Sequence, residues 1–130
     1  MRAITPRRSE RRHRRADVPA EALRLYLDSV AERARRAGRC LSALVLCDET
    51  GWLVGSLAGD RELDLPRVAA VGRWCAAGLG PLGDELEATG GEDLFAHPLP
   101  LHGRALTLTS VGARVRSVRT VAADVARILG

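Results

Sequence analysis

The strongest constraint on the fold is an apolar run that ends in a turn. Residues 40–47 read CLSALVLC, the turn-like segment Asp48-Glu49-Thr50-Gly51 follows, and residues 52–57 read WLVGSL. A short and almost wholly apolar run is typical of a strand that is covered on both faces. The acid-Thr-Gly segment has the composition of a hairpin turn, in which Gly51 supplies a positive φ. The sequence therefore predicts a central strand that forms a hairpin with residues 52–57, in a sheet that needs cover on both faces.

Three amphipathic segments predict helices around this hairpin. The first starts at Asp17 as N-cap, with Pro19 in its first turn, and ends at Gly38. The second starts at Asp64, with Pro66 in its first turn, and a third closes the chain. Their apolar stripes comprise Leu23, Tyr26, Leu27, Val30 and Ala34 in the first; Leu65, Val68, Ala69, Val71, Gly72, Cys75 and Leu79 in the second; and Val115, Val118, Val121, Ala122, Val125 and Leu129 in the third. The second helix is rich in small residues, which suits either close packing on the sheet or a helix pair across a dimer axis.

A second hairpin is predicted near the C-terminus. Residues 94–101 and 104–111 are two strand-like runs that turn at His102-Gly103. Pro98 and Pro100 cannot donate hydrogen bonds to a ladder, so the first of these strands is expected at an edge of the sheet. Residues 86–89 are a candidate for one further short strand before the Gly90-Gly91 turn. The expected fold class is α/β (α+β), an antiparallel sheet flanked by helices in the order α-β-β-α-(β)-β-β-α.

Charge divides the chain into two parts. The first fifteen residues hold seven arginines and one acid, a net charge of +6, whereas the rest holds thirteen arginines and fifteen acids, a net charge of −2. Residues 1–16 have almost no large apolar groups to offset the entropy of ordering, so they are expected to be a flexible, disordered tail. Residues 17–130 are the expected single domain. The arginines expected to act electrostatically in the tail are Arg7, Arg8, Arg11, Arg12, Arg14 and Arg15.

Several enzyme classes are excluded by composition, and no catalytic, cofactor or metal site is predicted. The chain contains no lysine, so it has neither a Schiff-base lysine nor the lysine of a phosphate-binding P-loop. Cys40, Cys47 and Cys75 form no Cys-x-x-Cys pair, which favours reduced core cysteines in a cytoplasmic protein. His97 and His102 are interpreted as turn and edge residues. No apolar run is long enough for a membrane span.

The quoted elements resemble the Roadblock / dynein light chain family. The resemblance covers Pro19 to Gly130 and is carried by the order of the elements, the hairpin ALVLCDETGWLVGSLAG, the small-residue second helix and the closing helix. Residues 80–100 depart most from the family pattern because of their glycines and prolines.

The resemblance implies a profilin-like fold and a non-enzymatic partner or regulator of small Ras-like GTPases. It also implies a homodimer, or a heterodimer with a related chain, that forms through the second helix and a sheet edge. The implied dimer residues are Val68, Val71, Gly72 and Cys75. The implied partner-facing residues are Arg67, Arg73 and Trp74.

Two alternatives belong to other functional classes. A small-ligand sensor of the GAF or PAS type also places helices around an antiparallel sheet, but it requires a pocket. A nucleic-acid-binding accessory protein would act through the arginine-rich tail, with binding that is non-specific and steeply dependent on salt. The same tail could bind another anionic surface.

Overall fold

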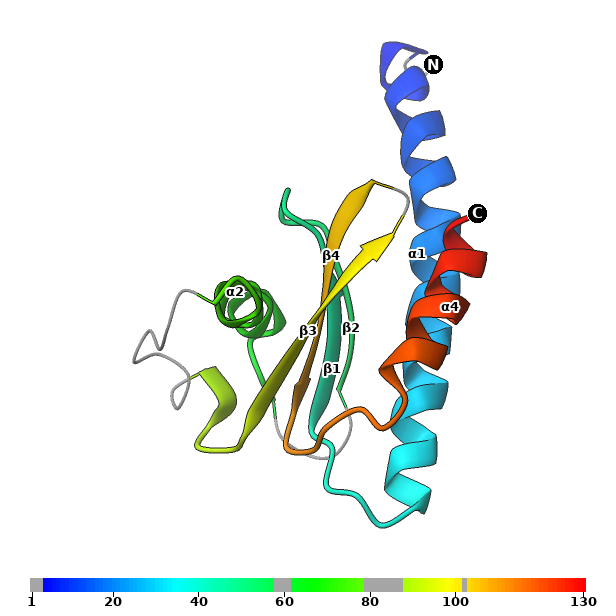
Figure 1. Cartoon of the computed structure of the whole chain (residues 1–130). Helices are drawn as coiled ribbons and strands as arrows, with labels where there is room; N and C mark the ends of the chain where they lie inside the picture. Colours follow the sequence, from blue (N-terminus) through cyan, green and yellow to red (C-terminus); the bar gives the residue numbers. More distant parts are fainter. Residues whose placement is uncertain (1–3, 58–61, 79–87, 102) are drawn as a thin grey trace.

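The computed structural model of the chain describes the backbone of residues 4–57, 62–78, 88–101 and 103–130, and within these ranges the side chains from residue 20 onward. Its four strands form one antiparallel sheet in the order β2-β1-β4-β3 (Figure 1). The strands are β1 (Ala43–Cys47), β2 (Leu53–Leu57), β3 (Leu94–Leu101) and β4 (Arg104–Val111). In the centre, Val45 of β1 pairs with Gly55 of β2 on one side and with Thr109 of β4 on the other. The predicted hairpin and the central, fully buried strand are confirmed.

Helices cover both faces of this sheet. Helices α1 (Ile4–Arg36) and α4 (Val118–Leu129) lie side by side on one face, and α2 (Leu65–Ala76) lies on the other (Figure 1). The predicted α+β class, with an antiparallel sheet flanked by helices, is therefore confirmed. Helix α4 begins three residues later than its apolar stripe suggested, and Val115 is buried in the connection that precedes it.

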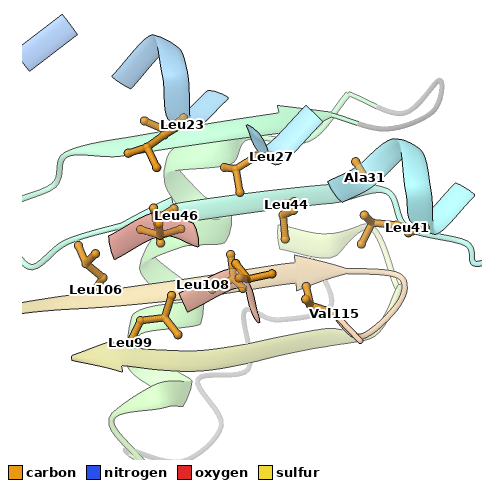
Figure 2. Packing of buried hydrophobic residues seen from close by; sticks show 14 residues of the cluster. Leu23, Leu27, Ala31, Leu41, Leu44, Leu46, Leu99, Leu106, Leu108 and Val115 are labelled. Carbon is orange, nitrogen blue, oxygen red and sulfur yellow. The ribbon is translucent and has the colours of Figure 1, made fainter. Parts of the chain in front are cut away.

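The alternation of side chains along the strands supplies a separate core to each face. Leu44 and Leu46 of β1 and Leu108 of β4 lie beside Leu23 and Leu27 of α1, as Figure 2 shows. The opposite face of the same strands carries a smaller cluster that α2 covers: Ala43, Val45, Cys47, Val68, Ala69 and Val111. One face of the sheet is thus covered by two helices, with a core made mostly of leucine. The other face is covered by one helix, with a core of smaller residues.

Helix α1 begins earlier than predicted. Residues 4–16 are described as helical backbone that runs into the predicted helix, so the predicted N-cap at Asp17 is wrong: Asp17 lies inside the helix. Arginine and alanine have high helix propensity, and each residue added to an existing helix contributes a hydrogen bond. Pro19 cannot donate one, so the ladder is interrupted there. The first turns of α1 extend past the sheet (Figure 1).

The second hairpin also forms as predicted, and β3 is an edge strand. Pro98 and Pro100 lie on β3, where a missing donor is tolerated at a sheet edge. The short strand expected at residues 86–89 is not found in its described half, since Ala88 and Thr89 are helical. The hydroxyl of Thr89 donates to the carbonyl of Glu92 at 2.7 Å and closes this turn. Residues 86 and 87 lie outside the described residues.

Within the described part of the chain, none of the helices has a stretch both long and apolar enough to cross a membrane.

Candidate interaction surface

Asp64 begins α2 as its sequence predicts. Its side-chain Oδ1 accepts a hydrogen bond from the backbone N–H of Arg67, with an N···O distance of 3.3 Å. Pro66 stands in the first turn, where the helix needs no N–H donor. This cap fixes where the helix starts and therefore which residues face the sheet and which face outward.

The inner side of α2 packs closely on the sheet. Val68, Val71 and Gly72 are buried there, and a Cβ on Gly72 would lie 1.9 Å from Oγ1 of Thr109 and 2.8 Å from its Cβ. A helix can lie this close to a strand because glycine has no side chain. Of the two interpretations of the small residues, the structure shows packing on the sheet. Of the four residues expected at a dimer interface, Val68, Val71 and Gly72 are thus buried within one copy, and Cys75 is half-buried.

The opposite side of α2 is exposed. Its residues recur every three or four positions and therefore lie along one side of the helix. We call this set the α2 outer face: Pro66, Ala70, Arg73, Trp74 and Ala77. Trp74 leaves 38% of its surface exposed, and Arg67 is half-buried beside the first turn. The structure thus brings two of the three predicted partner-facing residues, Arg73 and Trp74, together on one accessible surface.

The turn between β1 and β2 is organised by the buried carboxylate of Asp48. Oδ1 accepts hydrogen bonds from the backbone N–H and the hydroxyl of Thr50, at 2.8 and 2.7 Å, and from the backbone N–H of Trp52 at 3.1 Å. Oδ2 accepts from the guanidinium of Arg104 at 3.1 Å. Burial alone would raise the pKa of Asp48, but these hydrogen bonds outweigh it and hold the pKa below its ordinary value.

Two arginines connect this turn to its neighbours. The guanidinium of Arg73 donates to the backbone carbonyl of Asp48 at 3.4 Å, which joins the α2 outer face to the hairpin. The guanidinium of Arg104 lies 5.3 Å from the centre of the Trp52 ring, in cation–π geometry. Arg73 therefore has a partner within the chain, whereas the indole of Trp74 leaves a large apolar area exposed.

Sequence reasoning missed the role of Arg104. Its partner Asp48 lies 56 residues away, and only the pairing of β1 with β4 brings the two together. The sequence signal was weak: one arginine directly after a predicted turn. Because β4 pairs antiparallel with β1, which ends at Cys47 directly before Asp48, the first residues of β4 reach that end of the sheet.

The other candidate groups have structural surroundings. Burial raises the pKa of the Cys47 thiol to about 11. Cys40 was expected in the core but is exposed, because it lies in the connection before β1. Burial, and then the positive charge of Arg114, lower the pKa of His97. Among the residues whose side chains are described, no three or more His, Cys, Asp or Glu residues are grouped to hold a metal ion.

Two sets of predicted residues lie outside the described side chains. One is His102, at the turn of the second hairpin. The other is the set of tail arginines: Arg7, Arg8, Arg11, Arg12, Arg14 and Arg15.

No family model matches the chain, and neither a curated protein nor a solved structure is significantly similar to it.

Proposed function

We propose that this chain is a non-enzymatic interaction module that pairs with a second copy or a related chain and binds a small Ras-like GTPase, which it regulates or scaffolds. The order of the elements and the helices on both faces of an antiparallel sheet are consistent with the fold implied by the Roadblock resemblance. The choice of a GTPase as partner rests on that resemblance. The choice of the contact surface rests on the α2 outer face.

The observation that carries the proposal is the exposure of Trp74. Tryptophan and arginine are enriched among the residues that contribute most to binding at protein interfaces. Here a 38% exposed indole stands next to Arg73, between the small side chains of Ala70 and Ala77. Because the side chains of these alanines are short, a partner can cover the ring without displacing large side chains.

Charge indicates what kind of partner surface fits. Arg73 is exposed on the α2 outer face, and Arg67 is half-buried one and a half turns before it. A partner that offers carboxylates opposite these guanidinium groups would be favoured, because complementary charges raise the association rate and select among partners. An acidic patch on the GTPase is therefore part of the proposal.

The dimer is proposed to use the outer rather than the inner side of α2. Val68, Val71 and Gly72 are committed to the sheet, while Ala70 and Ala77 allow a second helix to approach from outside. Dimer contact and partner contact would then share or adjoin one surface. A cytoplasmic location is part of the same proposal.

The first experiment measures the solution mass of the full chain by light scattering over a dilution series. The wild type is expected to be a dimer, and Trp74→Ala is expected to shift the mass toward the monomer. Leu25→Ala is the matched control, because Leu25 is 57% exposed but lies on α1, across the sheet from α2. A monomeric wild type would contradict the proposed dimer. Equal masses for the two variants would contradict the proposed role of Trp74 in its interface.

The second experiment titrates a panel of purified Ras-like GTPases, loaded with GDP or a GTP analogue, into the full chain. Arg73→Glu is expected to weaken binding by about tenfold, since it reverses a charge at the contact. Arg119→Glu, at the start of α4 on the other face, is the matched control. Unchanged affinity for Arg73→Glu removes Arg73 from the interface. GTP hydrolysis followed in the same mixtures distinguishes regulation from scaffolding.

A further inference from the structure

The ligand-sensor alternative requires a cavity, and the structure has one on the face opposite α2. A cavity of about 220 Å³ lies between the later turns of α1, the connection from β4 to α4, and the first turn of α4. Its apolar wall includes Val30 and Ala34 of α1, Leu41 before β1, and Val115 and Val121 at the other side. Pockets for drug-sized ligands usually measure about 300–1,000 Å³, so this cavity suits a smaller molecule.

Four arginines surround this apolar wall. Arg33 comes from α1, Arg39 from the connection to β1, and Arg114 and Arg116 from the connection between β4 and α4. None of the described residues that line the cavity is acidic. Over the described residues, these four guanidinium groups form no ion pair within 4.0 Å of a carboxylate. Arg33 does interact with the hydroxyl of Tyr26 and, at longer range, with the charge of Asp124. The cavity therefore concentrates positive charge that the described carboxylates compensate only in part, at Arg33.

Asp124 is the acid that interacts with this side of the cavity, through Tyr26, Arg127 and the charge of Arg33. Asp124 accepts a hydrogen bond from the hydroxyl of Tyr26 at 2.6 Å and forms an ion pair with Arg127. Burial, and then this hydrogen bond to Asp124, raise the pKa of Tyr26 to about 12, so the phenol remains protonated. Tyr26 thus forms a neutral part of the cavity wall. Arg114 is held in place by the ring of Phe95, 5.0 Å from its guanidinium carbon.

The first turn of α4 adds hydrogen-bond donors to the same cavity. Ser117 and Thr120 line it, and Ser117 is the N-cap of α4 without a side-chain capping bond. Its hydroxyl instead donates to the hydroxyl of Thr120 at 2.8 Å. The first turn of α4 contains no acidic residue. The free N–H groups of a helix start and its positive dipole end favour an anion.

We propose that this cavity is a binding site for a small phosphate monoester with a short apolar body. A phosphate monoester carries a charge of about −1.5 to −2 at neutral pH and three acceptor oxygens, which suit several guanidinium groups and helix N–H donors better than a single carboxylate does. The arginines and α4 bind the phosphate, and the aliphatic wall packs against the body of the ligand. This site is independent of the α2 outer face, since the two lie on opposite sides of the sheet.

The test is calorimetric titration of the full chain with phenyl phosphate, with inorganic phosphate and phenol as separate titrants. Phenyl phosphate is expected to bind at one saturable site, more tightly than either titrant alone. The double variant Arg39→Gln and Arg116→Gln is expected to weaken that binding by about tenfold or more, because charge-assisted hydrogen bonds are lost. The matched control is the double variant Arg73→Gln and Arg119→Gln, which also removes two positive charges, from residues that do not line the cavity.

Two outcomes would overturn the site. Equal weakening by the double variant and by the control would assign the binding to general positive charge, including the N-terminal arginines. Equal affinity for phenyl phosphate and inorganic phosphate would mean that the aliphatic wall does not contribute to binding, and would contradict a ligand with an apolar body. Trp74→Ala should leave the titration unchanged, which separates this test from that of the proposed interaction surface.

Discussion

Helices α2 and α4 are both twelve residues long, yet they meet the sheet in different ways. Helix α2 lies against β4 through Gly72, and its first turn is closed by the carboxylate of Asp64. Helix α4 packs through Val121 and Val125 on the leucine-rich side, and its first turn has no side-chain cap. The two helices therefore expose different parts to solvent.

The difference shows that a helix can offer either its side or its end as a contact surface. In α2 the end is already bonded within the chain, and the outer side carries Trp74. In α4 the N-terminal end opens onto the arginine-lined cavity. The chain thus separates a candidate protein-binding surface from a candidate anion site by placing them on opposite faces of one sheet.

Crowding the inner side of α2 should have the largest effect. Gly72→Val places a branched side chain where even a Cβ would lie 1.9 Å from Thr109 Oγ1, so α2 must move away from β4. We expect the free energy of unfolding to fall by about 3 kcal/mol, at the upper end of what overpacking usually costs. Urea unfolding followed by tryptophan fluorescence measures it.

The matched control is Ala70→Val, which adds the same side chain to the exposed side of the same helix. At position 70 the lower helix propensity of valine is the only expected cost, so the free energy of unfolding should fall by about 0.5 kcal/mol. Similar losses for the two variants would mean that α2 does not rest on β4 through Gly72.

The next test removes the carboxylate charge of Asp48, the residue whose backbone carbonyl accepts a hydrogen bond from Arg73 of α2. Asp48→Asn leaves the turn without its ionised acceptor and leaves Arg104 without an ion-pair partner. We expect the free energy of unfolding to fall by about 2 kcal/mol, the range for hydrogen bonds to a buried charged group. Binding of phenyl phosphate on the α4 side should not change. A loss of phosphate binding in this variant would show that the two faces are coupled.

The contribution of Asp48 should also depend on pH with a defined sign. The hydrogen bonds lower its pKa in the folded state, so its stabilisation is fully present above the unfolded carboxyl pKa of about 3.9 and is lost as pH falls through the folded value. The stability difference between wild type and Asp48→Asn should therefore be constant near neutral pH and shrink below about pH 4. Unfolding curves at a series of pH values measure it, and a difference that grows on acidification would contradict the pKa shift.

The sequence predicted several elements whose signals are local, although the local cap signal at Asp17 was wrong. The turn at Asp48-Glu49-Thr50-Gly51 and the cap at Asp64 each depend on a few neighbouring residues, and both were predicted correctly. The small residues of α2 gave an ambiguous signal, because close packing on a sheet and on a second helix need the same composition. Only the pairing of Gly72 with Thr109 separates these possibilities, and that contact depends on the whole fold.

The arginine cavity could not be predicted for the same reason. Its charged residues come from α1 and the connection that follows it, and from the connection between β4 and α4, which lies at the other end of the domain in the sequence. Arginine is also common throughout the chain, so nothing in the sequence around Arg39 and Arg116 distinguishes them from arginines that are simply exposed to solvent. What distinguishes them is that they line one cavity and, among the described residues, form no ion pair with a carboxylate, and both are properties of the three-dimensional arrangement.

The smallest expected effects compare the two helix starts directly. Asp64→Ala removes a formed cap and should cost about 1 kcal/mol, whereas Ser117→Ala should cost at most about 0.3 kcal/mol because no capping bond is lost. Ser117→Asp should stabilise α4 by about 0.5 kcal/mol and at the same time weaken phenyl phosphate binding, because its carboxylate would occupy the N–H groups proposed for the ligand. Thermal unfolding and calorimetry on the three variants measure both. If Ser117→Asp stabilises the chain without weakening phosphate binding, then the end of α4 caps itself but does not contribute to the anion site, and the arginines alone would hold the phosphate.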